Sequence, residues 1–167
     1  MPNPVDKLKI KNTFIPKAAL VAQTAEAAAA VPIRNKQDQM IAIWDFPFLI
    51  GRESRLEISK NGELLVKERF KHSFVNNKTN DLYLVDFGKK LQISREHLLI
   101  EQTDDGRYYI LDRGSKCGSE ANGTRIGSGT EVERTEIKDG DTIILGTPSS
   151  PYRYIFVVLT EEDDQKA

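Results

Sequence analysis

The sequence predicts an all-β protein, a sandwich of two packed and mainly antiparallel sheets. From Met40 onward apolar residues recur with a period of two, and no long stretch has the period of an α-helix. All eleven glycines fall between Gly51 and Gly146, which concentrates turns in the same region. Many short strands separated by turns favour a β-sandwich over a parallel α/β sheet.

Strands are expected wherever an alternating run is bounded by turn residues. Residues 41–43 and 46–50 alternate in opposite phases, which predicts two strands meeting at a tight turn. Asn61-Gly62 supplies the positive φ angles that a two-residue hairpin needs. The hairpin strands and the other predicted strands span residues 56–60, 63–70, 82–86, 97–102, 107–112, 131–138, 142–145 and 152–159.

Composition divides the chain into three parts. Residues 1–40 contain only one of the thirteen aromatic residues, and six basic against three acidic residues give this segment a charge of +3. We expect a flexible N-terminal extension, with a short helix through its alanines, because it cannot build much core. Residues 41–160 form the predicted domain, and residues 161–167, with four acidic residues and one basic, form a solvated acidic tail.

Charge and composition exclude several classes of protein. The chain has 24 basic and 25 acidic residues, whereas proteins that bind nucleic acid or a membrane surface usually have a basic excess. Cys117, His72 and His97 are a poor ligand supply for zinc, and no other metal or cofactor is expected. No apolar stretch is long enough to span a bilayer, and no signal-peptide pattern is present. A single cysteine fits a reducing compartment, so we expect a cytoplasmic protein.

Three polar clusters lie at predicted strand ends, where a sandwich gathers its loops into a binding surface. Gly51-Arg52 follows an apolar strand, and the planar guanidinium suits a bidentate anion. Residues 94–97 (Ser-Arg-Glu-His) lead into the next apolar strand. The third cluster spans residues 112–118 and is followed by 122–126. Together these clusters predict that any anion is bound locally by a few side chains.

Arg52, Ser94 and Arg95 in these contexts resemble the forkhead-associated (FHA) domain, a β-sandwich that recognises phosphothreonine peptides. The resemblance covers most of residues 41–160, since an Asn-Asp-Leu strand start, an Asp-x-Gly-Ser loop and an Asp-Gly-Asp turn follow in the family's order. It implies that Arg52 clamps the phosphate, that Ser94 donates its hydroxyl to a phosphate oxygen, and that Arg95 is a flanking donor. His97 resembles the family's structural histidine, which braces the binding loop through backbone hydrogen bonds.

The third cluster departs from the family pattern. Aligned without a gap, Cys117 replaces the asparagine that holds the ligand's backbone, and Lys116 replaces a phosphate-contacting threonine. The same alignment makes Asn122-Gly123 a turn. The remaining residues expected to support the site are Gly51 and Gly118. A further departure is an insertion between Arg52 and Ser94, which maps to the predicted Asn-Gly hairpin and residues 72–78.

The sequence therefore predicts a non-catalytic signalling module whose partner is a threonine-phosphorylated protein or peptide. Its own N-terminal extension is a second candidate partner, through Thr13 or Thr24. The alternative is an FHA-like scaffold or self-association domain with weakened or lost phosphate dependence. An enzyme built on Ser94, His97 and Asp112 is disfavoured because no nucleophile elbow surrounds the serine. An enzyme built on Cys117 with a histidine is disfavoured because Cys117 is expected to be an unreactive loop cysteine.

Overall fold

The computed structural model of the chain describes residues 7–32, 39–54, 56–66 and 79–159. The predicted acidic tail lies outside the described residues. So does the second part of the predicted insertion, residues 72–78.

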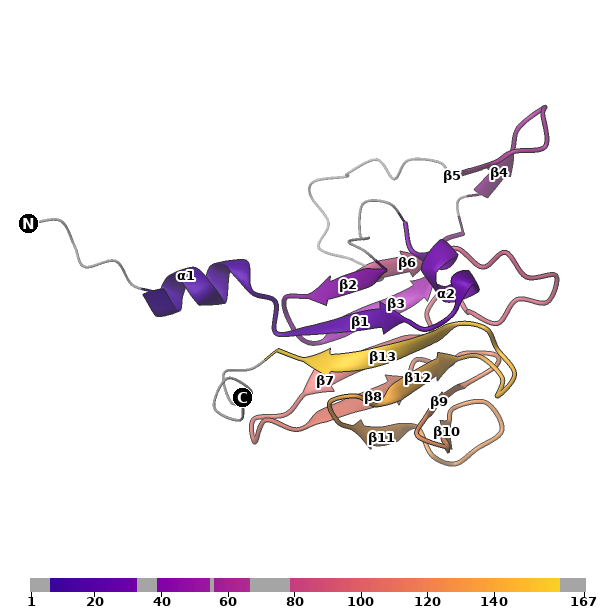
Figure 1. The fold of residues 1–167 in the computed structure, drawn as a ribbon. Helices are drawn as coiled ribbons and strands as arrows, with labels where there is room; N and C mark the ends of the chain where they lie inside the picture. Colours follow the sequence, from indigo (N-terminus) through magenta and orange to yellow (C-terminus); the bar gives the residue numbers. More distant parts are fainter. Residues whose placement is uncertain (1–6, 33–38, 55, 67–78, 160–167) are drawn as a thin grey trace, which may run out of the picture.

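One face of the molecule is a six-stranded sheet (Figure 1). Its strands are β1 (Ala18–Ala22), β2 (Met40–Ile43), β9 (Ser119–Ala121), β10 (Thr124–Ile126), β12 (Thr142–Leu145) and β13 (Arg153–Val158). They follow the order β10-β9-β12-β13-β1-β2, and all pairs are antiparallel.

A five-stranded sheet packs against the first. Its strands are β3 (Phe48–Arg52), β6 (Leu82–Leu84), β7 (Leu98–Gln102), β8 (Tyr108–Asp112) and β11 (Arg134–Ile137). The order is β11-β8-β7-β3-β6, with β6 parallel to β3 and the other pairs antiparallel. The predicted sandwich of two mainly antiparallel sheets is confirmed.

The core lies between the sheets because each strand turns alternate apolar side chains inward. Tyr154 and Phe156 of β13 are buried together with Ile100 of β7 and Ile110 of β8. The rings of Tyr108 and Phe156 meet edge to face across the sheets, with their centroids 5.2 Å apart. This packing fixes the strand ends that carry the polar loops.

The prediction that residues 1–40 lie outside the sandwich is wrong for part of that segment. β1 lies between β13 and β2 in the six-stranded sheet, and Ala18 and Leu20 are buried. Alanine is a weak strand former, so composition gave no sign of a strand here. A central strand packed on its neighbours tolerates small residues, and tertiary contacts decide its conformation.

The helix expected in the alanine-rich segment is present, but it covers only α2 (Ala25–Ala30). Thr24 caps it by accepting a hydrogen bond from the backbone N–H of Ala27 at 3.0 Å. Two long-range hydrogen bonds fasten α2 to both sheets: Tyr154 Oη donates to Ala27 O, and the N–H of Val85, just after β6, donates to Ala30 O. The helix therefore closes one side of the core.

Two Asn-Gly dipeptides form hairpin turns. The first lies between β4 (Leu56–Ile58) and β5 (Leu64–Val66), which form a two-stranded sheet of their own, so the predicted hairpin is present. The prediction of a two-residue turn is wrong, because Ser59 N–H donates to Glu63 O across a loop of residues 60–62, in which Gly62 has a positive φ and Asn61 does not. The second, Asn122-Gly123 with φ of 47° and 80°, joins β9 to β10. By contrast β2 and β3, expected to meet at a tight turn, belong to different sheets, because the largely exposed residues 44–47 carry the chain from one sheet to the other.

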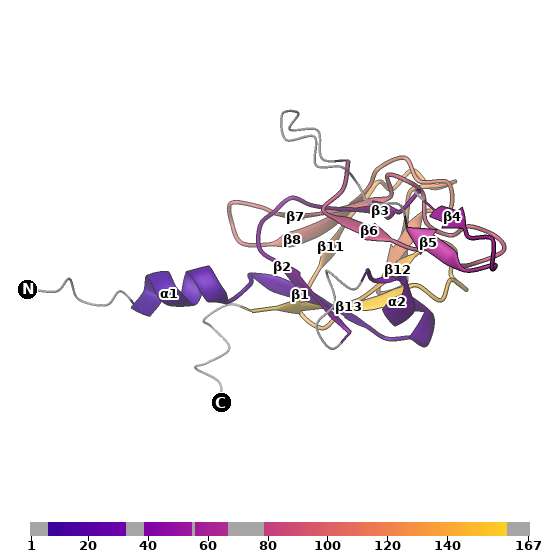
Figure 2. The ribbon, with the colours of Figure 1, turned by 90° about the horizontal axis from the view of Figure 1, so that it is seen from above.

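The helix α1 (Lys7–Phe14) projects from the sandwich at one end, and the β4–β5 hairpin lies toward the opposite end (Figure 2). On α1, the apolar side chains of Leu8, Ile10 and Phe14 are all exposed. Strand β3 runs away from α1, so its final residue, Arg52, lies at the end opposite this helix (Figure 1).

Candidate functional site

A pocket of about 560 Å³ lies beside the carboxyl end of β3. Loops that precede β6 and β7 and follow β3 and β8 surround it. Its lining residues are Arg52, Ser54, Thr79, Asn80, Tyr83, Ser94, Arg95, Glu96, Arg113 and Gly114. Three of the predicted ligand contacts, Arg52, Ser94 and Arg95, are thus brought together from positions more than forty residues apart.

Arg52 lines the pocket and is held in place by hydrogen bonds from its backbone and its side chain. Its backbone N–H donates to Ser94 O and its Nε donates to Ile93 O, both at 2.9 Å. The side-chain hydrogen bond uses only Nε, so the two Nη groups can donate to a ligand. The arginine is therefore positioned before any anion arrives.

Ser94 is oriented by the loop after β8. Its Oγ accepts a hydrogen bond from the backbone N–H of Lys116 at 2.9 Å. Because that bond uses a lone pair, the hydroxyl hydrogen can still donate to an anion in the pocket. The adjacent Arg95 is exposed and also lines the pocket.

His97 is fully buried and braces two loops. Its Nδ1 accepts from the backbone N–H of Ser94 at 2.9 Å, so the ring hydrogen of the neutral imidazole is on Nε2, which donates to Gly118 O at 2.9 Å. Burial lowers the pKa of His97 below 6.5, although the bond to Gly118 opposes this effect. The imidazole is therefore neutral at pH 7 and ties the Ser94 loop to the β8–β9 loop.

These contacts do not assemble a catalytic triad. The imidazole of His97 meets the backbone N–H of Ser94, not its hydroxyl. Its other side-chain contact is Ser119 Oγ at 3.0 Å, and Ser119 is fully buried. The carboxylate of Asp112 accepts from the N–H groups of its own loop, those of Gly114 and Ser115. No serine hydroxyl exposed to a substrate is activated by this histidine.

Gly51 lets the backbone of β3 approach the Ser94 loop. A Cβ at this position would lie 2.0 Å from Arg95 O and 2.5 Å from Asn80 Nδ2. The side chain of Asn80 fills this space, and its Nδ2 donates to Arg95 O at 2.8 Å. The glycine is required for close backbone approach, whereas Gly118, with φ of 71°, serves the turn after the third cluster.

Arg113 and Asn80 line the pocket but were not predicted as site residues. Arg113 donates from Nη1 to Asn80 Oδ1 at 2.5 Å and from Nη2 to Thr79 O at 2.8 Å. These contacts join segments 33 and 34 residues apart. The sequence placed Arg113 in the third polar cluster, and its position directly after an apolar strand was the signal that could have identified it.

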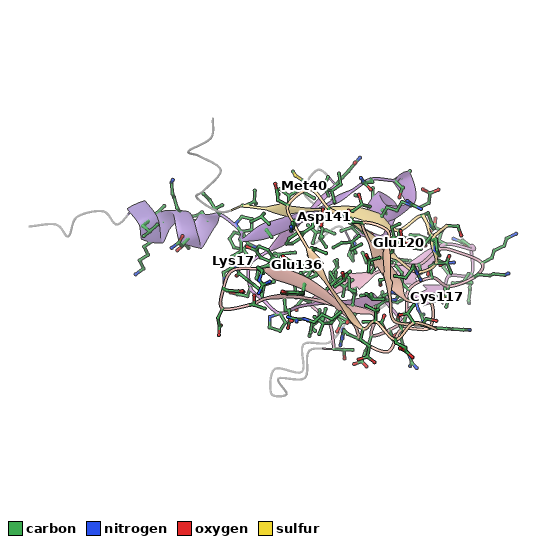
Figure 3. All side chains as sticks on the ribbon, turned by 90° about the horizontal axis from the view of Figure 1, so that it is seen from below. Lys17, Met40, Cys117, Glu120, Glu136 and Asp141 are labelled. Carbon is green, nitrogen blue, oxygen red and sulfur yellow. The ribbon has the colours of Figure 1, made fainter. Side chains whose placement is uncertain are left out.

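Lys116 and Cys117, both predicted to contact the ligand, are not among the residues that line the pocket. Lys116 contributes its backbone N–H to Ser94, and its side chain is exposed. The thiol of Cys117 lies 3.6 Å from Leu91 O, on the neighbouring loop. Figure 3 shows Cys117 at the end of the molecule opposite Lys17. Lys116 therefore borders the site through its backbone, and the backbone carbonyl of Cys117 accepts from Arg125 instead.

Neither a metal site nor a membrane-spanning helix is found among the described residues. No group of three or more His, Cys, Asp or Glu side chains there could hold a metal ion. None of the helices described is long and apolar enough to cross a membrane.

Comparison with known proteins identifies the fold and the family. Among solved structures, full-length yeast Pml1p superposes with a TM-score of 0.50 at 18% identity, over 85% of this chain and 81% of that one. An engineered FHA domain with a Myc-pTBD peptide gives 0.50 at 13% identity, over 90% and 97%. The FHA domain of CT664 from Chlamydia trachomatis gives 0.49 at 16% identity, over 86% and 98%. No curated protein matches the sequence. The FHA domain family matches residues 48–146, from β3 to the end of β12, and the chain therefore belongs to the FHA domain family.

Proposed function

We propose that the protein is a phosphothreonine-dependent, non-catalytic peptide-binding module. The observation that carries this proposal is the shared pocket of Arg52, Ser94 and Arg95, the three positions at which the FHA resemblance implies phosphate contacts. A phosphothreonine carries about −1.5 to −2 charges and three strong acceptor oxygens. Two guanidinium groups and one hydroxyl are donors suited to that group.

The expected affinity is modest. Hydrogen bonds to charged groups contribute about 1.5–3 kcal/mol each, and part of this is offset by the ordering of the peptide. Lys116 adds positive charge beside the site, but it cannot replace the amide that the family places at Cys117. We therefore propose weaker hold on the ligand's backbone than the family pattern implies, with phosphate recognition retained.

The partner is proposed to be a threonine-phosphorylated protein, with a second copy of this chain as one candidate. Thr13 is exposed on α1, whereas Thr24 is half-buried and its Oγ is bonded to Ala27 N and Pro151 O. Thr13 is therefore the accessible one of the two candidate sites. Since α1 and Arg52 lie at opposite ends of the sandwich (Figure 1), Thr13 would be bound by the pocket of another copy.

A cytoplasmic location is part of the same proposal. The only cysteine, Cys117, is unpaired. An unpaired thiol that is partly exposed fits a reducing compartment.

A peptide titration tests the function. A degenerate phosphothreonine library first identifies a binding sequence, which is then measured in phosphorylated and unphosphorylated forms by calorimetry. We expect at least about tenfold tighter binding of the phosphorylated form, and Arg52→Ala should abolish the difference because it removes the phosphate clamp. Arg107→Ala is the matched control, since Arg107 pairs with Asp105 away from this pocket. Equal binding of both forms by the wild-type protein would instead support the scaffold or self-association alternative.

A further inference from the structure

Among the described residues that line the phosphate pocket, one carries a solvent-accessible carboxylate. Glu96 lines the same pocket as Arg52, Ser94 and Arg95, and its side chain is 59% exposed. An acidic group is unexpected in a pocket for a dianion, because it repels the ligand that the arginines attract. In such a pocket a carboxylate can attract only a positively charged part of a ligand.

The ion pair that Glu96 forms within the protein leaves most of its carboxylate able to accept further hydrogen bonds. Its interaction with Arg113 is long, with Nη2 and Oε1 3.5 Å apart. Arg113 is itself only 16% exposed and donates at shorter distances to Asn80 Oδ1 and Thr79 O. A carboxylate has about four acceptor positions. Most of those of Glu96 therefore remain available to a ligand.

The pocket also has room for more than a phosphate. Its volume of about 560 Å³ lies within the range of about 300–1,000 Å³ that holds drug-sized ligands. A phosphothreonine bound between Arg52 and Ser94 therefore leaves space near Glu96 for a neighbouring side chain of the same peptide.

We propose that Glu96 selects phosphothreonine ligands that carry lysine or arginine close to the phosphothreonine. This inference rests on the proposed function. The basic side chain pairs with Glu96 while the phosphate is held by the arginines. An aspartate, glutamate or second phosphate at the same place is repelled by the carboxylate, which gives specificity through an unfavourable contact as well as a favourable one.

The test uses the phosphothreonine peptide selected above and the intact chain. Within two residues on either side of the phosphothreonine, each position in turn is made lysine, glutamine or glutamate, and each peptide is titrated at low salt. At one or more positions we expect lysine to bind about threefold tighter than glutamine and glutamate about threefold weaker, since partly exposed ion pairs have effects of this size. Glu96→Gln should remove both differences and keep the preference for the phosphorylated form. Glu136→Gln, at an exposed position away from this pocket, is the matched control (Figure 3).

Charge reversal separates pairing from a merely structural effect. Glu96→Lys should invert the order, so that glutamate peptides bind tighter than lysine peptides. If the wild-type protein prefers phosphorylated peptides but shows no charge preference at any position, or if the preference survives in Glu96→Gln, the role of Glu96 is refuted and the proposed function stands. If the wild-type protein does not distinguish phosphorylated from unphosphorylated peptides, the proposed function fails, and the inference fails with it.

Discussion

At the scale of single residues, the pocket depends on side chains that hold its loops together. His97 holds the Ser94 loop against Gly118, and Asn80 connects Arg95 to Arg113. The sequence predicted that Arg52, Ser94 and Arg95 belong together, and these three share the pocket. Glu96 belongs to the polar cluster 94–97 but was not predicted as a site residue, and Asn80 could not be predicted because its contribution depends on pairings between distant segments.

Substitution of Gly51 by alanine should destabilise the protein strongly. The new Cβ would lie 2.0 Å from Arg95 O, so backbone must move, which we expect to cost about 3 kcal/mol or more. Gly106→Ala is the control: it introduces a side chain at φ of 83° with nothing within 4 Å, and should cost about 1 kcal/mol. Urea unfolding measures both. Similar losses would mean that crowding at Gly51 is not the cause.

The buried His97 should make stability depend on pH. Because burial lowers the pKa of His97 below 6.5, at mildly acidic pH this histidine binds a proton in the unfolded chain and stays neutral in the folded protein. The free energy of unfolding should therefore be nearly constant well above pH 6.5 and fall as the pH drops through 6.5 and below, by up to about 1.4 kcal/mol per pH unit. Urea unfolding between pH 7.5 and 5.5 checks this.

The other histidine of the chain supplies the control for that experiment. His72→Gln should retain the fall in stability, whereas His97→Gln should lose it, whatever its stability at pH 7. An unchanged slope in His97→Gln would assign the effect to other groups.

At the scale of elements, the sequence predicted those strands whose pattern is local. The hairpin at Asn61-Gly62 is confirmed, but its turn differs from the predicted two-residue one. Gly62 has a positive φ and Asn61 does not, and Ser59 pairs with Glu63, so that residues 60–62 form the loop. Strands β9 and β10 are short and rich in polar residues, so no alternation distinguished them from a loop. Strand β1 was missed for a different reason. Its alanines favour a helix, and it is a strand only because it pairs with β13 and β2.

The helix α2 should depend on its cap. Thr24→Ala removes the hydrogen bond to Ala27 N and the one to Pro151 O, and should lower the free energy of unfolding by about 1–2 kcal/mol. Thr13→Ala is the matched control, because Thr13 is exposed and bonds only within α1, so its effect should stay within about 0.5 kcal/mol. Equal effects in thermal or urea unfolding would show that the cap contributes nothing.

At the scale of the whole molecule, the domain is larger than composition indicated. The first and last strands of the chain, β1 and β13, are neighbours in the six-stranded sheet. They pair along their length, from Ala18 opposite Val158 to Ala22 opposite Tyr154. A boundary at residue 41 would leave β13 without this partner and expose the core. The net charge of the whole chain is −1, whereas the pocket brings the side chains of Arg52, Arg95 and Arg113 together.

A fragment comparison tests this boundary. Residues 41–160 alone should not fold cooperatively, because Leu20 and its neighbours no longer cover the core, whereas residues 17–160 should retain a single cooperative transition. Circular dichroism during thermal unfolding, together with the dispersion of amide NMR signals, distinguishes the two. A cooperative transition in the shorter fragment would show that β1 is dispensable.

The pairing of β1 with β13 also governs when the protein can fold during its synthesis. Ala18 leaves the ribosome early, but its partner Val158 is made about 140 residues later, and bringing such distant segments together is slow compared with local hairpin formation. The hairpins around Asn61-Gly62 and Asn122-Gly123 can form on the growing chain. The six-stranded sheet is complete only after β13 has emerged. Until then the backbone N–H and C=O groups of β1 that pair with β13 are unpaired, and strands of other proteins can bind to them.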